Sequence, residues 1–91
     1  MSSIVLFEND CFTGKEFPAS GPVPDLKPLG FGDKTSSIIV LSGAWVVYQD
    51  KDYKGNSWIV KADGGVSNHG VYPNPASWGG KNDSISSLKP V

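Results

Sequence analysis

Two sequence patterns each occur twice in this chain of 91 residues, in the same order, and this duplication limits the possible folds more than any other feature. In the first pattern, over residues 7–14 and again over residues 48–55, an aromatic residue is followed by four spacers, a second aromatic residue, one spacer and a glycine. In the second pattern, residues 32–38 align without gaps onto residues 82–88. Because 91 residues support one hydrophobic core and not two, we expect two copies of one supersecondary unit in a single domain, residues 1–91.

Turn-forming residues indicate that this unit is built from strands. The chain has 11 glycines and 7 prolines, which leave few stretches long enough for a helix. Single helical turns are the most that is expected, for example at residues 25–27 or 74–78. The predicted fold class is therefore all-β. Runs of β-branched, aromatic and aliphatic residues predict short strands at residues 4–7, 37–41, 45–48, 57–61 and 85–88.

Each repeated pattern has a physical interpretation. The first is a hairpin whose two aromatic side chains stack over the turn, with the glycine in a conformation or close contact that a Cβ atom would forbid. The second places Asp, Asn and Ser side chains in a loop that leads into a strand at Ile38 or Ile85. In a single copy, such a loop would favour turn chemistry, in which these side chains bond neighbouring backbone N–H groups. Two copies favour metal binding.

The paired patterns resemble the βγ-crystallin family, including its calcium-binding single-domain members, over nearly the whole chain. Trp45 and residues 74–80 are similar to the tryptophan-bearing corners of that family. The resemblance implies a sandwich of two Greek-key motifs with two four-stranded antiparallel sheets. The first Greek key would cover about residues 1–42 and the second about residues 43–91.

The resemblance also implies two calcium ions, each bound between the polar loops of both halves. Carboxylate, carbonyl and hydroxyl oxygens together suit a hard cation of this kind. One site would use the backbone carbonyl of Glu8, the Asp33 side chain, the Lys34 carbonyl and the Ser86 hydroxyl. The other would use the carbonyl of Gln49, the Asp83 side chain, the Ser84 carbonyl and the Ser36 hydroxyl.

One position departs from the family pattern: Gly32 stands where Asn or Asp is expected, whereas the second loop matches throughout. We therefore predict two unequal sites, with dissociation constants of about 10⁻⁶ to 10⁻⁴ M. At ~1 mM calcium and a dissociation constant of ~10 μM, each site would stabilise the folded state by about 2.7 kcal/mol. Calcium is expected to stabilise the fold by clamping the two halves together.

Other functions receive less support from the sequence. Residues 50–61 begin like an EF-hand loop but have Lys54 and Lys61 at ligand positions, without flanking helices. The chain has one histidine, His69, and one cysteine, Cys11, and no third group that would orient such a pair for catalysis, so an enzyme is not expected. The remaining alternatives are a calcium-dependent module that binds proteins or carbohydrates, and a small inhibitor or toxin on the same fold.

Charge and cysteine content bear on partners and compartment. The formal net charge is −1, and the eight Lys and Arg residues are scattered, so neither nucleic acid nor an anionic membrane is an expected partner. A single cysteine cannot form an intrachain disulfide, and the N-terminal segment lacks the features of a signal peptide. We expect a cytoplasmic protein that is a monomer, with weak self-association as the alternative.

Overall fold

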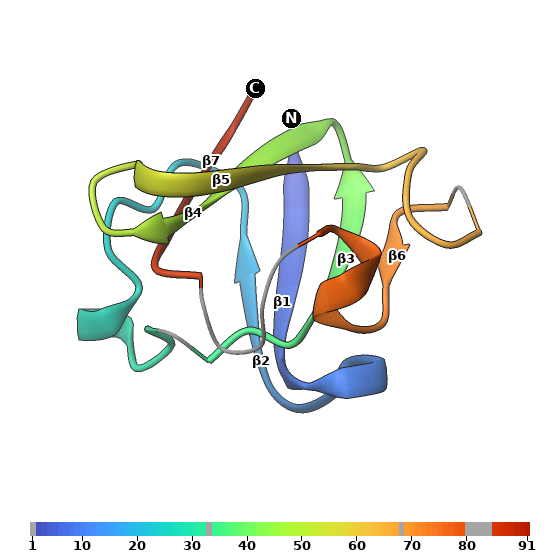
Figure 1. Ribbon diagram of the computed structural model, residues 1–91, viewed down its shortest axis with the longest axis horizontal. Helices are drawn as coiled ribbons and strands as arrows, with labels where there is room; N and C mark the ends of the chain where they lie inside the picture. Colours follow the sequence, from blue (N-terminus) through green and yellow to red (C-terminus); the bar gives the residue numbers. More distant parts are fainter. Residues whose placement is uncertain (1, 33, 68, 80–84) are drawn as a thin grey trace.

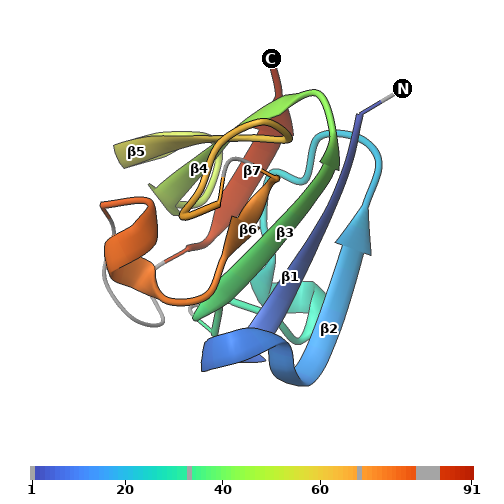
Figure 2. The same cartoon turned by 90° about the vertical axis from the view of Figure 1, so that its right-hand side faces the viewer.

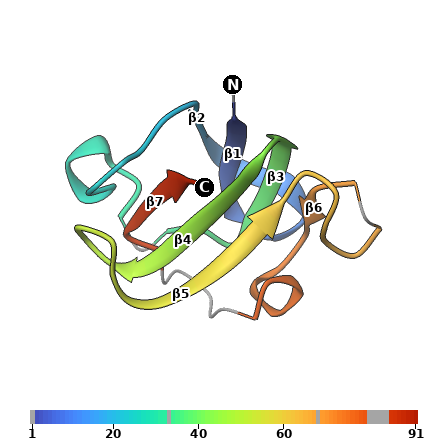
Figure 3. The same cartoon turned by 90° about the horizontal axis from the view of Figure 1, so that it is seen from above.

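A computed structural model describes residues 2–32, 34–67, 69–79 and 85–91, and in it two antiparallel β-sheets form a sandwich (Figure 1). The first sheet has the order β2-β1-β3-β6 and the second the order β5-β4-β7. The strands are β1 (Ser3–Asn9), β2 (Thr13–Ala19), β3 (Ser37–Ser42), β4 (Ala44–Asp50), β5 (Lys54–Lys61), β6 (Val71–Tyr72) and β7 (Ser87–Pro90). Figure 3 shows the strands of the second sheet side by side. The all-β prediction is confirmed.

Helical structure in the described residues is limited to three short 3₁₀ turns: η1 (Asp10–Phe12), η2 (Lys27–Leu29) and η3 (Pro75–Ser77). Two of these turns, η2 and η3, lie in the connections where the sequence allowed a single turn. Across the described ranges, none of the helical segments has the length and apolar character needed to span a membrane.

The second sheet contains three described strands, where the family resemblance implied four. Val23 lies in the place of the fourth strand: its N–H donates to the Leu88 carbonyl at 2.8 Å, and its carbonyl accepts from the Leu88 N–H at 3.0 Å. Pro22 and Pro24 flank Val23 and have no N–H group with which to extend a ladder. The fourth strand is therefore reduced to a single bridge.

The first sheet is built mainly from the first half of the chain and the second sheet from the second half, but each sheet also includes a segment from the opposite half. β6, from the second half, pairs with β3 of the first, and the two strands lie side by side in Figure 1. Val23, from the first half, pairs with β7. The core between the sheets combines residues of both halves. Its fully buried apolar side chains are Ile4, Leu6, Leu26, Ile38, Trp45, Val47, Val60, Ile85 and Leu88.

Two strands, β2 and β6, were not predicted from the sequence. Both lie at the edges of the first sheet. β2 contains Lys15, Glu16 and Pro18, which are typical of an exposed edge strand and hide it from a search for apolar runs. β6 has only two residues, which is too short for any sequence period. Edge strands of this kind are recognised by their pairing and not by their composition.

The predicted hairpins are confirmed. The rings of Phe7 and Phe12 meet edge to face at 5.6 Å, and those of Tyr48 and Tyr53 do so at 5.7 Å. The glycine that follows each pair has positive φ, 82° in the first hairpin. A Cβ atom on that glycine, Gly14, would lie 2.7 Å from the Asn9 side chain. The repeated glycine therefore meets both a conformational and a steric requirement.

Candidate metal site

Each of the two polar loops, which belong to the aligned segments 32–38 and 82–88, contains two consecutive serines. The second of them, Ser37 or Ser87, forms hydrogen bonds with the backbone of the adjacent hairpin. Ser37 is fully buried; its hydroxyl accepts from the Phe12 N–H at 3.0 Å and donates to the Asn9 carbonyl at 2.6 Å. In the second half, the Ser87 hydroxyl likewise accepts from the Tyr53 N–H at 3.1 Å and donates to the Asp50 carbonyl at 2.6 Å. Turn chemistry therefore accounts for this serine in both loops, and the metal-binding hypothesis concerns the residues before it.

The first serine of each loop is attached to the hairpin through its backbone. The Ser36 N–H donates to the Phe7 carbonyl at 2.9 Å, and the Ser86 N–H donates to the Tyr48 carbonyl at 2.9 Å. Each bonded carbonyl belongs to the residue directly before a predicted ligand. These bonds therefore bring each polar loop beside the backbone of Glu8 or of Gln49.

The backbone of Glu8 lies at an irregularity of the sheet. The last pair between β1 and β3 is Phe7 with Ser37, so Glu8 lies beyond the end of that ladder. On the other side, the register of β1 with β2 shifts, and Glu8 faces two residues of β2, Gly14 and Lys15. Gln49 has the same position in the second half, where the register of β4 with β5 shifts. A bulge interrupts the regular ladder and is a common way to present a backbone group at a functional site.

The structure describes five of the eight predicted ligands. Ser36 is buried, with 3% of its surface exposed. Glu8, Gln49 and Ser86 are partly buried, and Lys34 is exposed. The other three predicted ligands lie outside the described residues: Asp33, Asp83 and Ser84.

The two polar loops meet at one cavity. It has a volume of about 480 Å³ and contains Gly32 from the first loop and Ser86 from the second. The N–H of Leu26 donates to the Ser86 carbonyl at 2.8 Å and ties the segment before η2 to the second loop. The backbone hydrogen bonds of Ser36 and Ser86 each lie within one half of the chain, whereas each predicted calcium site needs ligands from both halves. Among the described residues, the two polar loops come together at this shared cavity.

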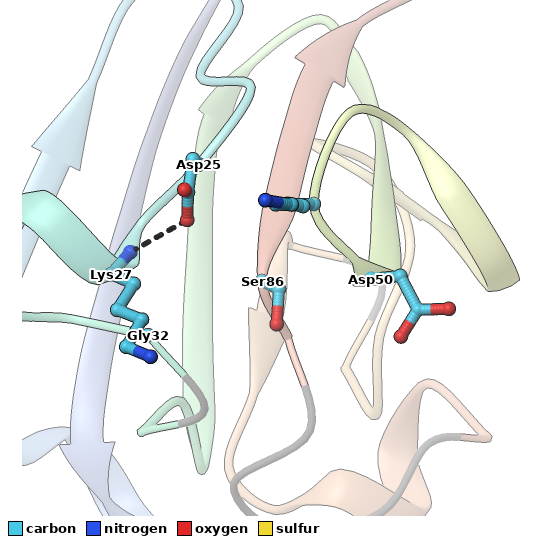
Figure 4. Close-up of a pocket in the computed structure, with 6 residues that line it drawn as sticks. Asp25, Lys27, Gly32, Asp50 and Ser86 are labelled. Carbon is cyan, nitrogen blue, oxygen red and sulfur yellow. Dashed lines mark hydrogen bonds between the residues drawn. The ribbon is translucent and has the colours of Figure 1, made fainter.

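This cavity contains two carboxylates that the sequence did not single out as ligands. Asp25 accepts a hydrogen bond from the Lys27 N–H at 3.1 Å, and Asp50 lies at the end of β4. Figure 4 shows Asp25 and Asp50 on opposite sides, with Ser86 between them. Lys27 and Lys51 also line the cavity and balance the two acidic groups. No local sequence motif joins Asp25 to Asp50, because only the fold brings their segments together.

Packing explains why Gly32 departs from the family pattern. A Cβ atom on Gly32 would lie 2.8 Å from the Cα atom of Lys27 and 2.9 Å from its Cβ atom. Gly30, which follows η2, has the left-handed conformation, with φ of 78°. The chain turns there and brings Gly32 back against Lys27, the first residue of η2. Any side chain at position 32 would therefore push against the backbone of η2. This contact leaves no room for the Asn or Asp of the family pattern.

The two hairpins also hold the halves together through their tips. The Cys11 N–H donates to the Pro73 carbonyl at 2.8 Å, and the Asp52 N–H donates to the Pro24 carbonyl at 2.7 Å. Cys11 and Asp52 both have positive φ, 57° and 58°. Cys11 and Asp52 therefore occupy equivalent positions in the two hairpins.

The described residues also bear on the rival sites. The EF-hand interpretation is contradicted, because most of residues 50–61 lie in β5, a strand. Of the three tryptophans on which a sugar could stack, Trp45 and Trp78 are buried in the core, whereas Trp58 is only partly buried. In the part of the chain that the structure describes, no group of three or more His, Cys, Asp or Glu side chains could hold a metal.

Two copies of a bulged hairpin and a serine loop, joined in one two-sheet sandwich, define the class of Greek-key β-sandwich proteins. Comparison with known proteins identifies the family. Residues 3–91 match the sequence model of the Beta/Gamma crystallin family, and the chain belongs to this family, whose members are generally not enzymes.

Individual relatives support this assignment. The chain is 44% identical to a Beta/gamma-crystallin of Ciona intestinalis over 89 residues, covering 98% of each. It is 35% identical to Gamma-crystallin N of Xenopus tropicalis over 88 residues, but spans only 44% of that protein. Among solved structures, it is similar to the Ciona βγ-crystallin, with a TM-score of 0.87 and 43% identity over 98% of this chain and 99% of that one. An archaeal βγ-crystallin gives a TM-score of 0.82 and 31% identity, over 99% and 98%.

Proposed function

We propose that this chain is a calcium-binding βγ-crystallin domain, with two ions held between its paired loops and a fold that calcium stabilises. The observation that carries the proposal is the cavity shared by Gly32 and Ser86, one residue from each polar loop. It is supported by the duplicated bulges, which set the backbones of Glu8 and Gln49 beside these loops.

The available donors fit a hard cation. Backbone carbonyls at Glu8, Lys34 and Gln49 and hydroxyls at Ser36 and Ser86 are neutral oxygen ligands. The carboxylates of Asp33 and Asp83 and the carbonyl of Ser84 would complete the two sets, as the sequence predicts. A soft metal would require thiolate or imidazole, which these sets lack.

The role of the bound ions is structural or buffering. Each proposed site takes groups from both halves, so binding would add a bond between segments that are far apart in the sequence. With about one carboxylate for each ion, dissociation constants of about 10⁻⁶ to 10⁻⁴ M are expected. At this affinity the domain would be loaded in a calcium-rich compartment and would release calcium in a calcium-poor one.

Calorimetric titration with calcium tests the proposal. The wild-type chain should bind two ions, and Asp83→Ala and Ser86→Ala should each weaken binding, at different sites. Asp63→Ala is the matched control, because Asp63 is exposed and lines a separate cavity with Gly43 and Lys61. Unchanged isotherms for both site variants would contradict the proposal, as would equal losses in the control.

A further inference from the structure

A segment from the opposite half of the chain lies beside the strand that follows each polar loop. Val23 pairs with Leu88 of β7, and Tyr72 of β6 pairs with Ile38 of β3. Figure 2 shows β6 beside β3. Ile38 and Leu88 are the last residues of the two aligned patterns, so they are equivalent. Val23 and Tyr72 therefore occupy equivalent places in the two halves.

The next two residues of each segment extend this equivalence. Val23 and Tyr72 are each followed by a proline whose carbonyl accepts a hydrogen bond from a hairpin tip. After the proline comes Asp25 in one half and Asn74 in the other. Aspartate and asparagine have nearly the same shape, but only the aspartate carries a charge. The two halves thus differ by one negative charge at this position.

The local structure does not require that charge. The Asp25 Oδ1 atom accepts from the Lys27 N–H at 3.1 Å, directly before η2. The Asn74 Oδ1 atom accepts from the Ser77 N–H, also at 3.1 Å, at the start of η3. Either residue supplies the oxygen acceptor that such a turn needs. The charge of Asp25 therefore has another role.

The register of the strands places this position beside the first serine of each loop. In an antiparallel pair, a step forward along one strand corresponds to a step back along its partner. Two steps from the pairs above, Asp25 comes beside Ser86 and Asn74 comes beside Ser36. The N–H of Leu26 donates to the Ser86 carbonyl at 2.8 Å, and Asp25 and Ser86 line the same cavity (Figure 4). The charged position therefore lies at the loop that contains Ser86.

The segment that contains Asp25 also occupies the space next to Gly32. A Cβ atom on Gly32 would lie 2.8 Å from the Cα atom of Lys27. Residues 25–27 therefore take the room that an Asn or Asp side chain at position 32 would need. They also bring the carboxylate of Asp25 to the cavity that Gly32 lines. A carboxylate from another segment thus stands in for the one that the first loop lacks.

We propose that Asp25 makes the two calcium sites unequal: its carboxylate strengthens binding of the ion at Ser86, whereas Asn74 gives no such help to the ion at Ser36. This inference rests on the proposed function. The Oδ1 atom of Asp25 bonds the Lys27 N–H, and the second carboxylate oxygen acts on the ion or on water bound to it. The site at Ser86 is therefore the tighter one, although its loop contains Gly32.

The charge of one carboxylate sets the size of the effect. A divalent cation about 6 Å from a unit charge in a water-like dielectric gains roughly ten-fold in affinity, and about three- to ten-fold once salt screens the charge. Lys27 and Lys51 line the same cavity, but both residues are exposed. Their long side chains can turn into solvent when a cation enters, whereas the hydrogen bond to the backbone holds Asp25 in place.

Calorimetric titration of Asp25→Asn with calcium tests this inference. Asparagine keeps the acceptor for the Lys27 N–H, so the fold should be retained. Asp25→Asn should weaken the same binding step as Ser86→Ala, by about three- to ten-fold. The reciprocal variant, Asn74→Asp, should tighten the other step by a similar factor. Asp63→Asn is the matched control and should change neither step, because Asp63 lines a separate cavity.

Salt distinguishes an effect of charge from a change in structure. Between about 0.05 M and about 0.5 M potassium chloride, the difference in affinity between the wild type and Asp25→Asn should shrink, because the ions screen the carboxylate. A difference that does not respond to salt would overturn the inference. Two bound ions in the wild type with an identical Asp25→Asn isotherm would also overturn it, but would leave the proposed function standing. A wild type that binds no calcium would overturn both.

Discussion

Thr35 contains a buried hydroxyl, and its replacement tests how this domain is stabilised. The side chain is fully buried, and its Oγ1 atom makes no hydrogen bond to any of the residues that the structure describes. The equivalent residue of the second half is Ile85, a member of the apolar core. Burying an unsatisfied polar group costs about 1–3 kcal/mol, and valine has nearly the shape of threonine. Thr35→Val should therefore raise the free energy of unfolding by about 1 kcal/mol, or the melting temperature by roughly 4–8 °C.

Ser37→Ala is the matched variant, because it also removes a fully buried hydroxyl. The Ser37 hydroxyl has two partners, Phe12 and Asn9, which the alanine would leave unpaired. This variant should lower the free energy of unfolding by about 2–3 kcal/mol. Equilibrium unfolding in urea, followed by tryptophan fluorescence without calcium, measures both changes. A loss of stability in Thr35→Val, or the same sign for both variants, would refute the reasoning.

Two further predictions concern the polar loops. Gly32→Asn restores the family pattern in sequence but places a side chain against Lys27, so thermal melting should show a loss of about 1–3 kcal/mol of stability; an unchanged melting temperature would contradict the packing explanation. Removing calcium with a chelator should lower the melting temperature by more than about 10 °C if both proposed sites are filled, and an unchanged scanning calorimetry profile would count against calcium as a stabiliser.

The duplicated patterns predicted much of the fold because they encode local geometry. A pair of aromatic residues followed by glycine specifies a bulged hairpin, and both hairpins are present. The apolar runs gave five strands correctly within a few residues. β2 and β6 were not predicted because an edge strand depends on backbone pairing with its neighbour, which leaves no apolar pattern in the sequence of the strand itself. The Val23 bridge likewise depends on a partner, Leu88, that local sequence does not reveal.

The candidate site was less accessible to sequence reasoning. The serine loops could be found because their sequence pattern repeats. Ser36 and Ser86 have equivalent positions in the structure, where each N–H donates to the carbonyl of the first aromatic residue of its hairpin. Asp25 and Asp50 could not be found, since they meet only at a cavity formed by both halves. The reason for Gly32 was also hidden, because it depends on the return of the chain to Lys27.

The exchange of segments between the halves has a consequence for how the chain folds. A fragment ending at Ser42 would lack β6, the neighbour of β3, and a fragment starting at Ala44 would lack the Val23 segment beside β7. The tip of each hairpin would also lose its acceptor, because Cys11 donates to the Pro73 carbonyl of the second half and Asp52 donates to the Pro24 carbonyl of the first. Since neither half contains all of its native contacts, we expect the duplicated chain to fold in one cooperative step, at a rate limited by pairing between distant segments.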